Sequence, residues 1–91
     1  MSTSLIADRK LLLKTFRQLK TKQDQAYFID DLFTEEEILD LAQRLKIAKL
    51  ILEGKTYEEI STLVNTSTST VSKIGQIIKF GKGSFSKVFT K

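Results

Sequence analysis

The sequence predicts an all-α protein, and three observations support that prediction. The chain of 91 residues contains no proline, and its four glycines all lie at or after Gly54. Leu, Ile, Lys and Glu are frequent, which is typical of helical proteins. Two Thr-x-x-Glu sequences, at 34–37 and 56–59, can form capping boxes where helices begin. We expect one domain over residues 1–91.

The chain is too short to bury a large core by itself. A domain of this size removes only about 60–65% of its unfolded surface from water. Cysteine and histidine are both absent, so the sequence offers neither a disulfide nor a structural zinc site of the usual ligands. Self-association is the remaining common way to gain core, and the absence of cysteine fits a cytoplasmic protein.

The apolar runs are short. The longest are about three residues, as at Leu11–Leu13 and Leu50–Leu52. Neither a membrane-spanning helix nor the apolar centre of a signal peptide fits into a run of that length. We therefore expect no membrane association.

Residues 56–78 have the pattern of a helix-turn-helix. Thr56 and Glu59 can cap the start of its first helix. Asn65 can take the left-handed conformation that turns the chain, and Ser67 can cap the second helix, which we predict over Ser67–Ile78. This arrangement is the one in which a second helix enters the DNA major groove.

Apolar and polar residues separate onto two sides of these helices. The expected buried side chains are Ile60, Leu63 and Val64 in the first helix and Val71, Ile74 and Ile78 in the second. The outward side chains of the second helix are short hydroxyls, one lysine and one glutamine, which suit groove contacts. We predict DNA contacts from Ser67, Thr68, Ser69, Ser72, Lys73 and Gln76.

Positive charge accumulates toward the C-terminus. Residues 34–64 carry four basic and seven acidic side chains, whereas residues 65–91 carry five lysines and no acidic residue. A phosphate backbone would be attracted to that end, and we predict phosphate contacts from Lys55, Lys79 and Lys82. A solvated lysine-rich tail explains the charge distribution equally well.

Residues 4–33 are predicted to form the N-terminal helices. Leu5, Leu12, Phe16 and Leu19 make a broad apolar stripe that needs a partner surface. Thr21 can cap a second, shorter helix. The stripe could dock on its own domain or on a second subunit, and the small size of the chain favours the second subunit.

Residues 34–54 are predicted to form the central helix, which Gly54 ends. A helix that is apolar around most of its circumference is expected to be buried on several sides. Its main apolar set is Ile38, Leu41, Ala42, Leu45, Ala48 and Leu52. Residues 80–91 form a tail in which Phe85, Val88 and Phe89 are expected to hold the chain end onto the domain, or to add to a dimer interface.

The sequence gives no indication of an enzyme. Histidine and cysteine, which supply the most common nucleophiles, bases and metal ligands, are absent. The acidic residues Glu35–Glu37 are explained by the positive end of a helix dipole. Gly81 and Gly83 match no phosphate-binding loop. We predict no catalytic residue, no metal and no cofactor.

The chain resembles the tryptophan-repressor superfamily over about two thirds of its length, and is more similar to the YerC/YecD-type branch than to the tryptophan-sensing repressor. The matching sequences are YFIDDLFTEEEILDLAQR at 27–44, AKLILEGKTYEEI at 48–60, STSTVSKI at 67–74 and FGKGSFSKVF at 80–89. The resemblance implies about six helices and an intertwined homodimer whose core contains the N-terminal helices. It also implies recognition helices about 34 Å apart, one turn of duplex.

The resemblance also bears on ligand binding. In tryptophan-sensing members, the corepressor lies between the central and recognition helices, where two arginines hold it and a glycine follows the second arginine. Arg44 and Thr34 occupy matching positions, but Lys73 replaces the second arginine and Ile74 replaces the glycine. Lysine lacks the bidentate fork of arginine, and a branched Ile74 would project into the space of the indole. The resemblance therefore implies a protein that does not respond to tryptophan.

The function predicted from the sequence is that of a cytoplasmic, homodimeric transcriptional regulator that binds double-stranded DNA sequence-specifically. Two alternatives remain open at this point. The wide apolar N-terminal helix would also suit a helical protein-interaction module. Arg44 would also suit a regulator that senses a small corepressor other than tryptophan.

Overall fold

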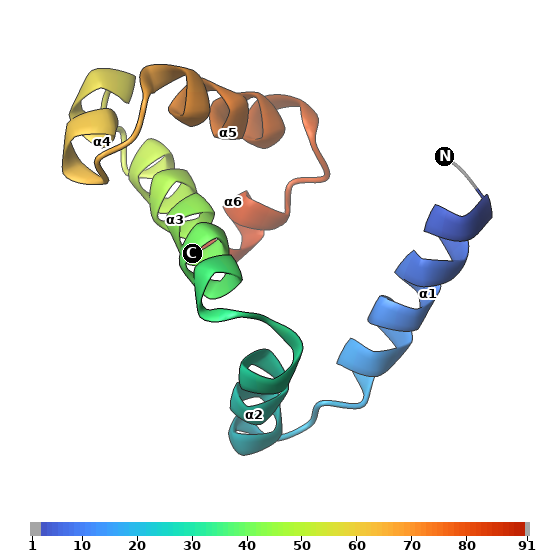
Figure 1. The fold of residues 1–91 in the computed structure, drawn as a ribbon. Helices are drawn as coiled ribbons and strands as arrows, with labels where there is room; N and C mark the ends of the chain where they lie inside the picture. The colour runs from blue at the N-terminus through green and yellow to red at the C-terminus, as the bar shows by residue number, and fades with distance from the viewer. Residues whose placement is uncertain (1–2, 91) are drawn as a thin grey trace. The chain divides into compact units, whose positions relative to one another are not determined.

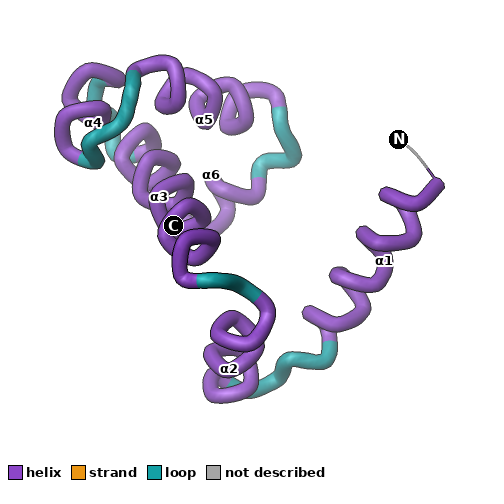
Figure 2. Tube along the Cα trace, in the orientation of Figure 1, coloured by secondary structure: helices purple, strands orange, loops and turns teal. Residues whose placement is uncertain are grey.

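The structure, a computed structural model, describes residues 3–90, which form helices joined by short turns (Figures 1 and 2). The helices are α1 (Thr3–Arg17), α2 (Lys22–Leu32), α3 (Glu35–Leu52), α4 (Tyr57–Leu63), α5 (Thr68–Phe80) and α6 (Ser84–Phe89). No strand occurs within residues 3–90, so the predicted all-α class with about six helices is confirmed. The chain divides into two compact units, residues 1–35 and 36–91, and the division falls at the start of α3.

The N-terminal unit contains α1 and α2. Thr21 caps α2 as predicted, because its hydroxyl accepts a hydrogen bond from the Asp24 amide at 3.0 Å. The rings of Phe16 and Phe28 meet edge to face, with centroids 5.7 Å apart. Neither helix contains a buried residue, so the part of this unit that the structure describes has no buried core of its own.

The second unit is built around a small apolar core. α3 contributes Ile47 and Ala48, α4 contributes Ile60, and α5 contributes Val71 and Ile74. Figure 1 shows α4 and α5 across one end of α3, with α6 beside it. Partly buried side chains enlarge this core, and they are Leu50, Ile51, Tyr57, Val64, Ile78, Phe85 and Phe89.

The turns between these helices occur where the sequence predicts them. Gly54 has a φ of 90°, and the amide of Lys55 donates to the carbonyl of Leu50 at 3.1 Å, which ends α3 in a left-handed cap. Asn65 has a φ of 54° and lies between α4 and α5. Both reversals are confirmed, and both depend on residues that tolerate positive φ.

The predicted burial of the central helix is only partly correct. Within the described chain α3 buries Ile47 and Ala48, whereas Leu41 and Leu45 of the predicted set are exposed. Leu39, nearer the start of the helix, is 69% exposed. The second unit therefore covers the C-terminal half of α3 and leaves much of its apolar surface uncovered.

Two further core predictions are wrong. Leu63, expected on the buried side of the first helix of the motif, is 63% exposed. The core is contacted instead by Ile60 and Tyr57 of α4 and by Val64 directly after the helix. Val88 is also exposed, whereas Phe85 and Phe89 pack against the core. In residues 3–90, no helix combines the length and apolar character that crossing a membrane requires.

Candidate nucleic-acid interface

The start of α4 is fixed by a complete capping box. The Thr56 hydroxyl accepts from the Glu59 amide at 3.1 Å, and the Glu59 carboxylate accepts from the Thr56 amide at 3.1 Å. The hydrogen bond from the Thr56 amide, followed by that from its hydroxyl, lowers the pKa of Glu59 below its ordinary value. The sequence thus fixes the first helix of the motif through local hydrogen bonds.

The orientation of α5 follows from its buried side. Val71, Ile74 and Gly75 are buried, and Ile78 is partly buried, so this face of the helix is turned toward the core. Ser67 caps the helix as predicted, because its hydroxyl accepts from the Thr70 amide at 3.2 Å. The helix begins at Thr68 and continues to Phe80, two residues beyond the predicted end.

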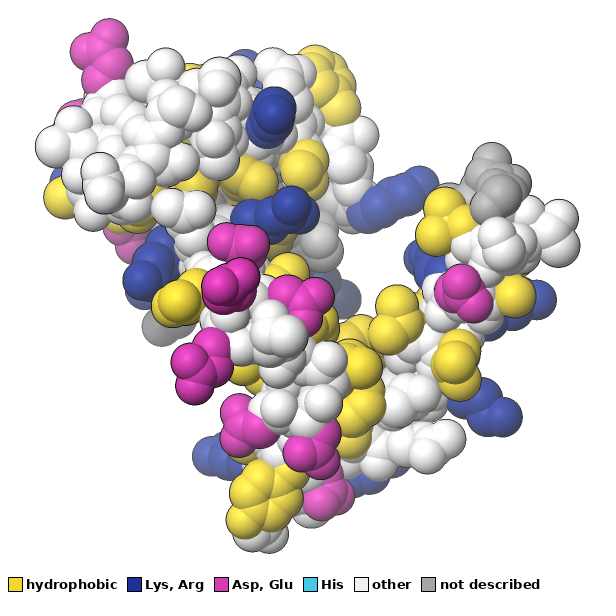
Figure 3. Space-filling model, viewed as in Figure 1, with side chains coloured by type: hydrophobic (Ala, Val, Ile, Leu, Met, Phe, Trp, Pro, Cys, Tyr) yellow, Lys and Arg dark blue, Asp and Glu magenta, His cyan; other side chains and the backbone are white. Residues whose placement is uncertain are grey.

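The opposite side of α5 carries most of the predicted contact residues. Thr68, Ser69, Lys73 and Gln76 are exposed, whereas Ser72 is partly buried. They follow one another along a single helix, within its first three turns. In Figure 3 the surface over α4 and the start of α5 is mostly uncharged, with lysine or arginine side chains farther along α5. The structure therefore brings the predicted groove-facing residues onto one surface.

The hydroxyls at the start of α5 also interact with one another. The Ser67 oxygen lies 3.1 Å from the Ser69 hydroxyl and 3.0 Å from the Thr70 hydroxyl. Because Ser67 already accepts from a backbone amide, its hydroxyl is mainly a structural cap. Thr68 and Ser69 are both exposed beside this cap, and the Ser69 hydroxyl also contacts Ser67.

The three lysines predicted to contact phosphate have different surroundings. Lys79 lies in the last turn of α5 and Lys82 in the turn before α6, and both are exposed. Lys55 precedes α4 and lines a surface hollow with Glu58 and Glu59. These carboxylates lower the positive potential around Lys55, which distinguishes its surroundings from those of Lys79 and Lys82.

Comparison with known proteins identifies the family. The family described as Trp repressor protein matches residues 7–91. The chain belongs to the Trp repressor family. It is 36% identical over 74 residues to the uncharacterized protein YerC of Bacillus subtilis (strain 168), an alignment that covers 81% of this chain and 71% of YerC.

Two solved structures have the same fold. A TrpR-like protein from Eubacterium eligens ATCC 27750 has a TM-score of 0.78 at 31% identity, covering 88% of this chain and 82% of the other. A Staphylococcus aureus protein described as a candidate Trp repressor has a TM-score of 0.79 at 30% identity, covering 97% and 90%. The predicted resemblance to the Trp repressor superfamily and its YerC-type branch is therefore confirmed.

The two residues predicted for ligand binding lie in different parts of this Trp repressor fold. Thr34 precedes α3 and belongs to the N-terminal unit, whereas Arg44 is exposed on α3 in the second unit. Lys73 is exposed on α5, and Ile74 beside it is buried among the side chains of the core. Ile74 thus fills part of the core that a glycine would leave open.

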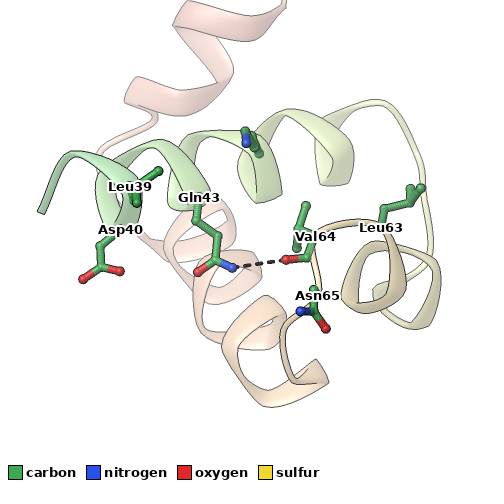
Figure 4. Close-up of a pocket in the computed structure, with 7 residues that line it drawn as sticks. Leu39, Asp40, Gln43, Leu63, Val64 and Asn65 are labelled. Atoms are coloured by element: carbon green, nitrogen blue, oxygen red, sulfur yellow. Dashed lines mark hydrogen bonds between the residues drawn. The ribbon is translucent and has the colours of Figure 1, made fainter. Parts of the chain in front are cut away.

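A pocket of about 380 Å³ lies elsewhere on α3 (Figure 4). It is lined by Leu39, Asp40, Gln43 and Lys46 of α3 and by Leu63, Val64 and Asn65 at the end of α4. The Gln43 amide donates to the Val64 carbonyl at 3.3 Å and so connects α3 to the turn before α5. Neither Arg44 nor Thr34 lines this pocket.

Three structurally important residues are absent from the sequence predictions. Gln43 holds the turn, and Tyr57 lies against Gly75 where α4 and α5 approach each other. A glycine in the interior of a helix was the one available signal, because such a glycine usually marks a close approach.

Within residues 3–90, no group of three or more acidic, histidine or cysteine side chains could hold a metal ion.

Proposed function

We propose that this Trp repressor family member is a homodimeric transcriptional regulator that binds double-stranded DNA in the cytoplasm through α5. The observation that supports this most is the division of α5 into two faces. Val71 and Ile74 fix one face in the core, and Thr68, Ser69 and Lys73 remain exposed on the other. A helix held in this way by a helix-turn-helix is suited to enter the major groove.

The side chains of α5 suit a mixed mode of recognition. Serine and threonine hydroxyls can bond either to base edges or to phosphates, and the Thr68 methyl can contact a thymine methyl. Gln76 can pair with adenine, and Lys73 can reach guanine or a phosphate. None of these is a long bidentate arginine, so bridging waters and DNA shape contribute to the specificity of this mode.

A second copy of the chain would cover the apolar surface of the N-terminal unit. Leu5, Leu11 and Leu12 of α1 and Ile29 and Leu32 of α2 are all exposed. Figure 3 shows apolar side chains along the surfaces of both helices. Exposed apolar patches of this kind are typical of an interface, and an intertwined dimer would give this small chain the core that it lacks.

We further propose that tryptophan does not control this protein. Lys73 cannot form the bidentate contact of an arginine with a carboxylate, and the buried Ile74 occupies the space beside it. Isothermal calorimetry with tryptophan should give no saturable heat. A saturable one-to-one isotherm, with tryptophan-dependent DNA binding, would overturn this part of the proposal.

Selection of bound duplexes from a random pool tests the DNA-binding proposal directly. The enriched duplexes should contain two related half-sites with centres about 10 base pairs apart, because one turn of duplex separates the recognition helices. The logarithm of the binding constant should fall by about 0.9 per phosphate contact with the logarithm of salt concentration. A pool without enrichment and a salt-independent affinity would overturn the proposal.

The size of the protein in solution separates the proposal from its main alternative. Sedimentation should show a dimer before DNA is added. A monomer that binds no duplex would instead indicate that the apolar N-terminal unit serves as a docking surface for a different protein.

A further inference from the structure

Gly75 is buried in the middle of α5, where a glycine is otherwise unfavourable. A methyl group at this position would collide with the hydroxyl oxygen of Tyr57 and would lie 2.9 Å from its ring atom Cζ. Both atoms belong to the side chain of Tyr57, which is partly buried against the core, so relief of the collision would require the ring to move from that contact. The absence of a side chain at Gly75 therefore lets Tyr57 come this close to the backbone of α5.

Tyr57 is held at a defined place. It is the first residue of α4, directly after the Thr56 capping box, and the buried Ile60 anchors the same helix one turn later. Its ring reaches from the start of α4 to the middle of α5. The turn with Asn65 joins the opposite end of α4 to the start of α5.

The approach of Tyr57 to Gly75 thus adds a further contact between the two helices to the covalent turn and the shared core. The covalent turn alone would allow α5 to pivot about its N-terminal end, within the limits set by the core. A contact in the middle of α5 restricts that pivot. Lys73 and Gln76 lie near Gly75 in the sequence of the helix, so a pivot at this level would displace them.

We propose that Tyr57 and Gly75 are positioning residues for DNA recognition, because their contact sets the direction in which α5 projects from α4. This inference rests on the proposed function. It does not require either residue to touch DNA. It attributes the specificity of the protein in part to a contact on the inner side of the motif.

The test measures affinity for the selected duplex and for an unrelated duplex at the same salt concentration. Gly75→Ala should weaken binding to the selected duplex by about tenfold or more, a loss typical of one mismatched base pair. Binding to the unrelated duplex should change by less than about threefold, because it depends on phosphate contacts. The ratio of the two affinities should therefore fall, which a general loss of folded protein would not produce.

Removal of the tyrosine hydroxyl should rescue part of this loss. In the Tyr57→Phe background, Gly75→Ala should weaken selective binding less than in the native background, since the nearest colliding atom is gone. In the Tyr57→Leu background, Gly75→Ala should raise the melting temperature, because alanine is the better helix former. In a Tyr27→Phe background, where the tyrosine that is replaced is an exposed one in α2, Gly75→Ala should have the same effect as in the native background.

The inference is overturned if Gly75→Ala has the same effect in the native, Tyr57→Phe and Tyr57→Leu backgrounds. It is also overturned if the affinities for the selected and the unrelated duplex fall together with the melting temperature. If Gly75→Ala does not fold, Tyr57→Leu alone decides, since it should lower the affinity ratio and leave the fold intact. If the native protein selects no duplex, the proposed function itself fails, and this is seen before any variant is made.

Discussion

The two units of the chain are both built from helices, but they differ in how many apolar side chains those helices bury. α3 to α6 enclose five buried apolar residues, whereas α1 and α2 enclose none. Both units have capped helices, and both have apolar side chains at helical spacing. The difference therefore lies in partners: the second unit covers its own apolar surface around Ile47, Ile60 and Val71, and the first does not.

In the proposed function, this difference separates two contributions. The second unit holds α5 in a fixed orientation by itself, and so it can present a reading surface. The N-terminal unit exposes the surface that would join two such reading helices. Variants in the first unit should therefore act on assembly, and variants in the second on folding or DNA contact.

The largest effect is expected from Leu12→Gln in α1. Burial of one leucine side chain contributes about 1.5–3 kcal/mol, and a two-fold symmetric interface loses it twice. Sedimentation should show a shift toward monomer, and affinity for the selected duplex should fall about 100-fold with the loss of the second reading helix.

Lys14→Gln in the same helix is the control, and it should leave the dimer intact. A dimer that persists unchanged in Leu12→Gln would show that this surface is not the interface between copies.

Ile60→Ala in α4 should destabilise the second unit by about 3 kcal/mol, because it removes a fully buried side chain and leaves a cavity. Leu63→Ala, three residues later and mostly exposed, should cost less than about 1 kcal/mol. Urea unfolding measures both. Ile60→Val, expected to cost about 1 kcal/mol, keeps the comparison possible if the alanine variant does not fold. Equal losses at residues 60 and 63 would contradict the described core.

Lys73→Ala should weaken DNA binding without changing the melting temperature, since the side chain is exposed. If Lys73 contacts a phosphate, the affinity should fall by the same factor for all duplexes, and the salt slope should be smaller by about two for the dimer. If Lys73 contacts a base, the variant should lose about 1–3 kcal/mol of binding free energy and discrimination at one base-pair position. Lys87→Ala in α6 is the control lysine. An unchanged affinity in Lys73→Ala would place the contact surface elsewhere.

The smallest effect concerns the capping box. Thr56→Ala should cost about 1 kcal/mol of stability at neutral pH. The pKa of Glu59 is lower in the folded chain than its ordinary value of 4.5, so its carboxylate stabilises the fold above that pH. This stabilisation should disappear as the pH falls through the lowered pKa, because the protonated carboxyl is a weaker acceptor.

Glu59→Gln provides the test, because the glutamine side chain can still accept a hydrogen bond from the Thr56 amide but cannot titrate. Melting temperatures between pH 7 and pH 3 should fall more steeply for the native protein than for Glu59→Gln. Parallel curves would show that the Glu59 carboxylate does not contribute to acid sensitivity.

The sequence by itself determined the features that depend on a few neighbouring residues. The caps at Thr21, Thr56 and Ser67 and the left-handed turns at Gly54 and Asn65 were all predicted, because the donors, acceptors and backbone preferences lie within six residues of one another. The spacing of the apolar residues in α5 likewise predicted which face of the helix is turned toward the core, and therefore which face is exposed.

Only the tertiary structure decided which apolar side chains are covered and which backbones come close. Leu63, Leu41 and Leu45 have the same local pattern as core residues, and their exposure depends on where the neighbouring helices end. The approach of Tyr57 to Gly75 joins residues eighteen positions apart and depends on the crossing of two helices. Local hydrogen bonds depend on residues that are close in the sequence, whereas the burial of a side chain depends on every surface that packs against it.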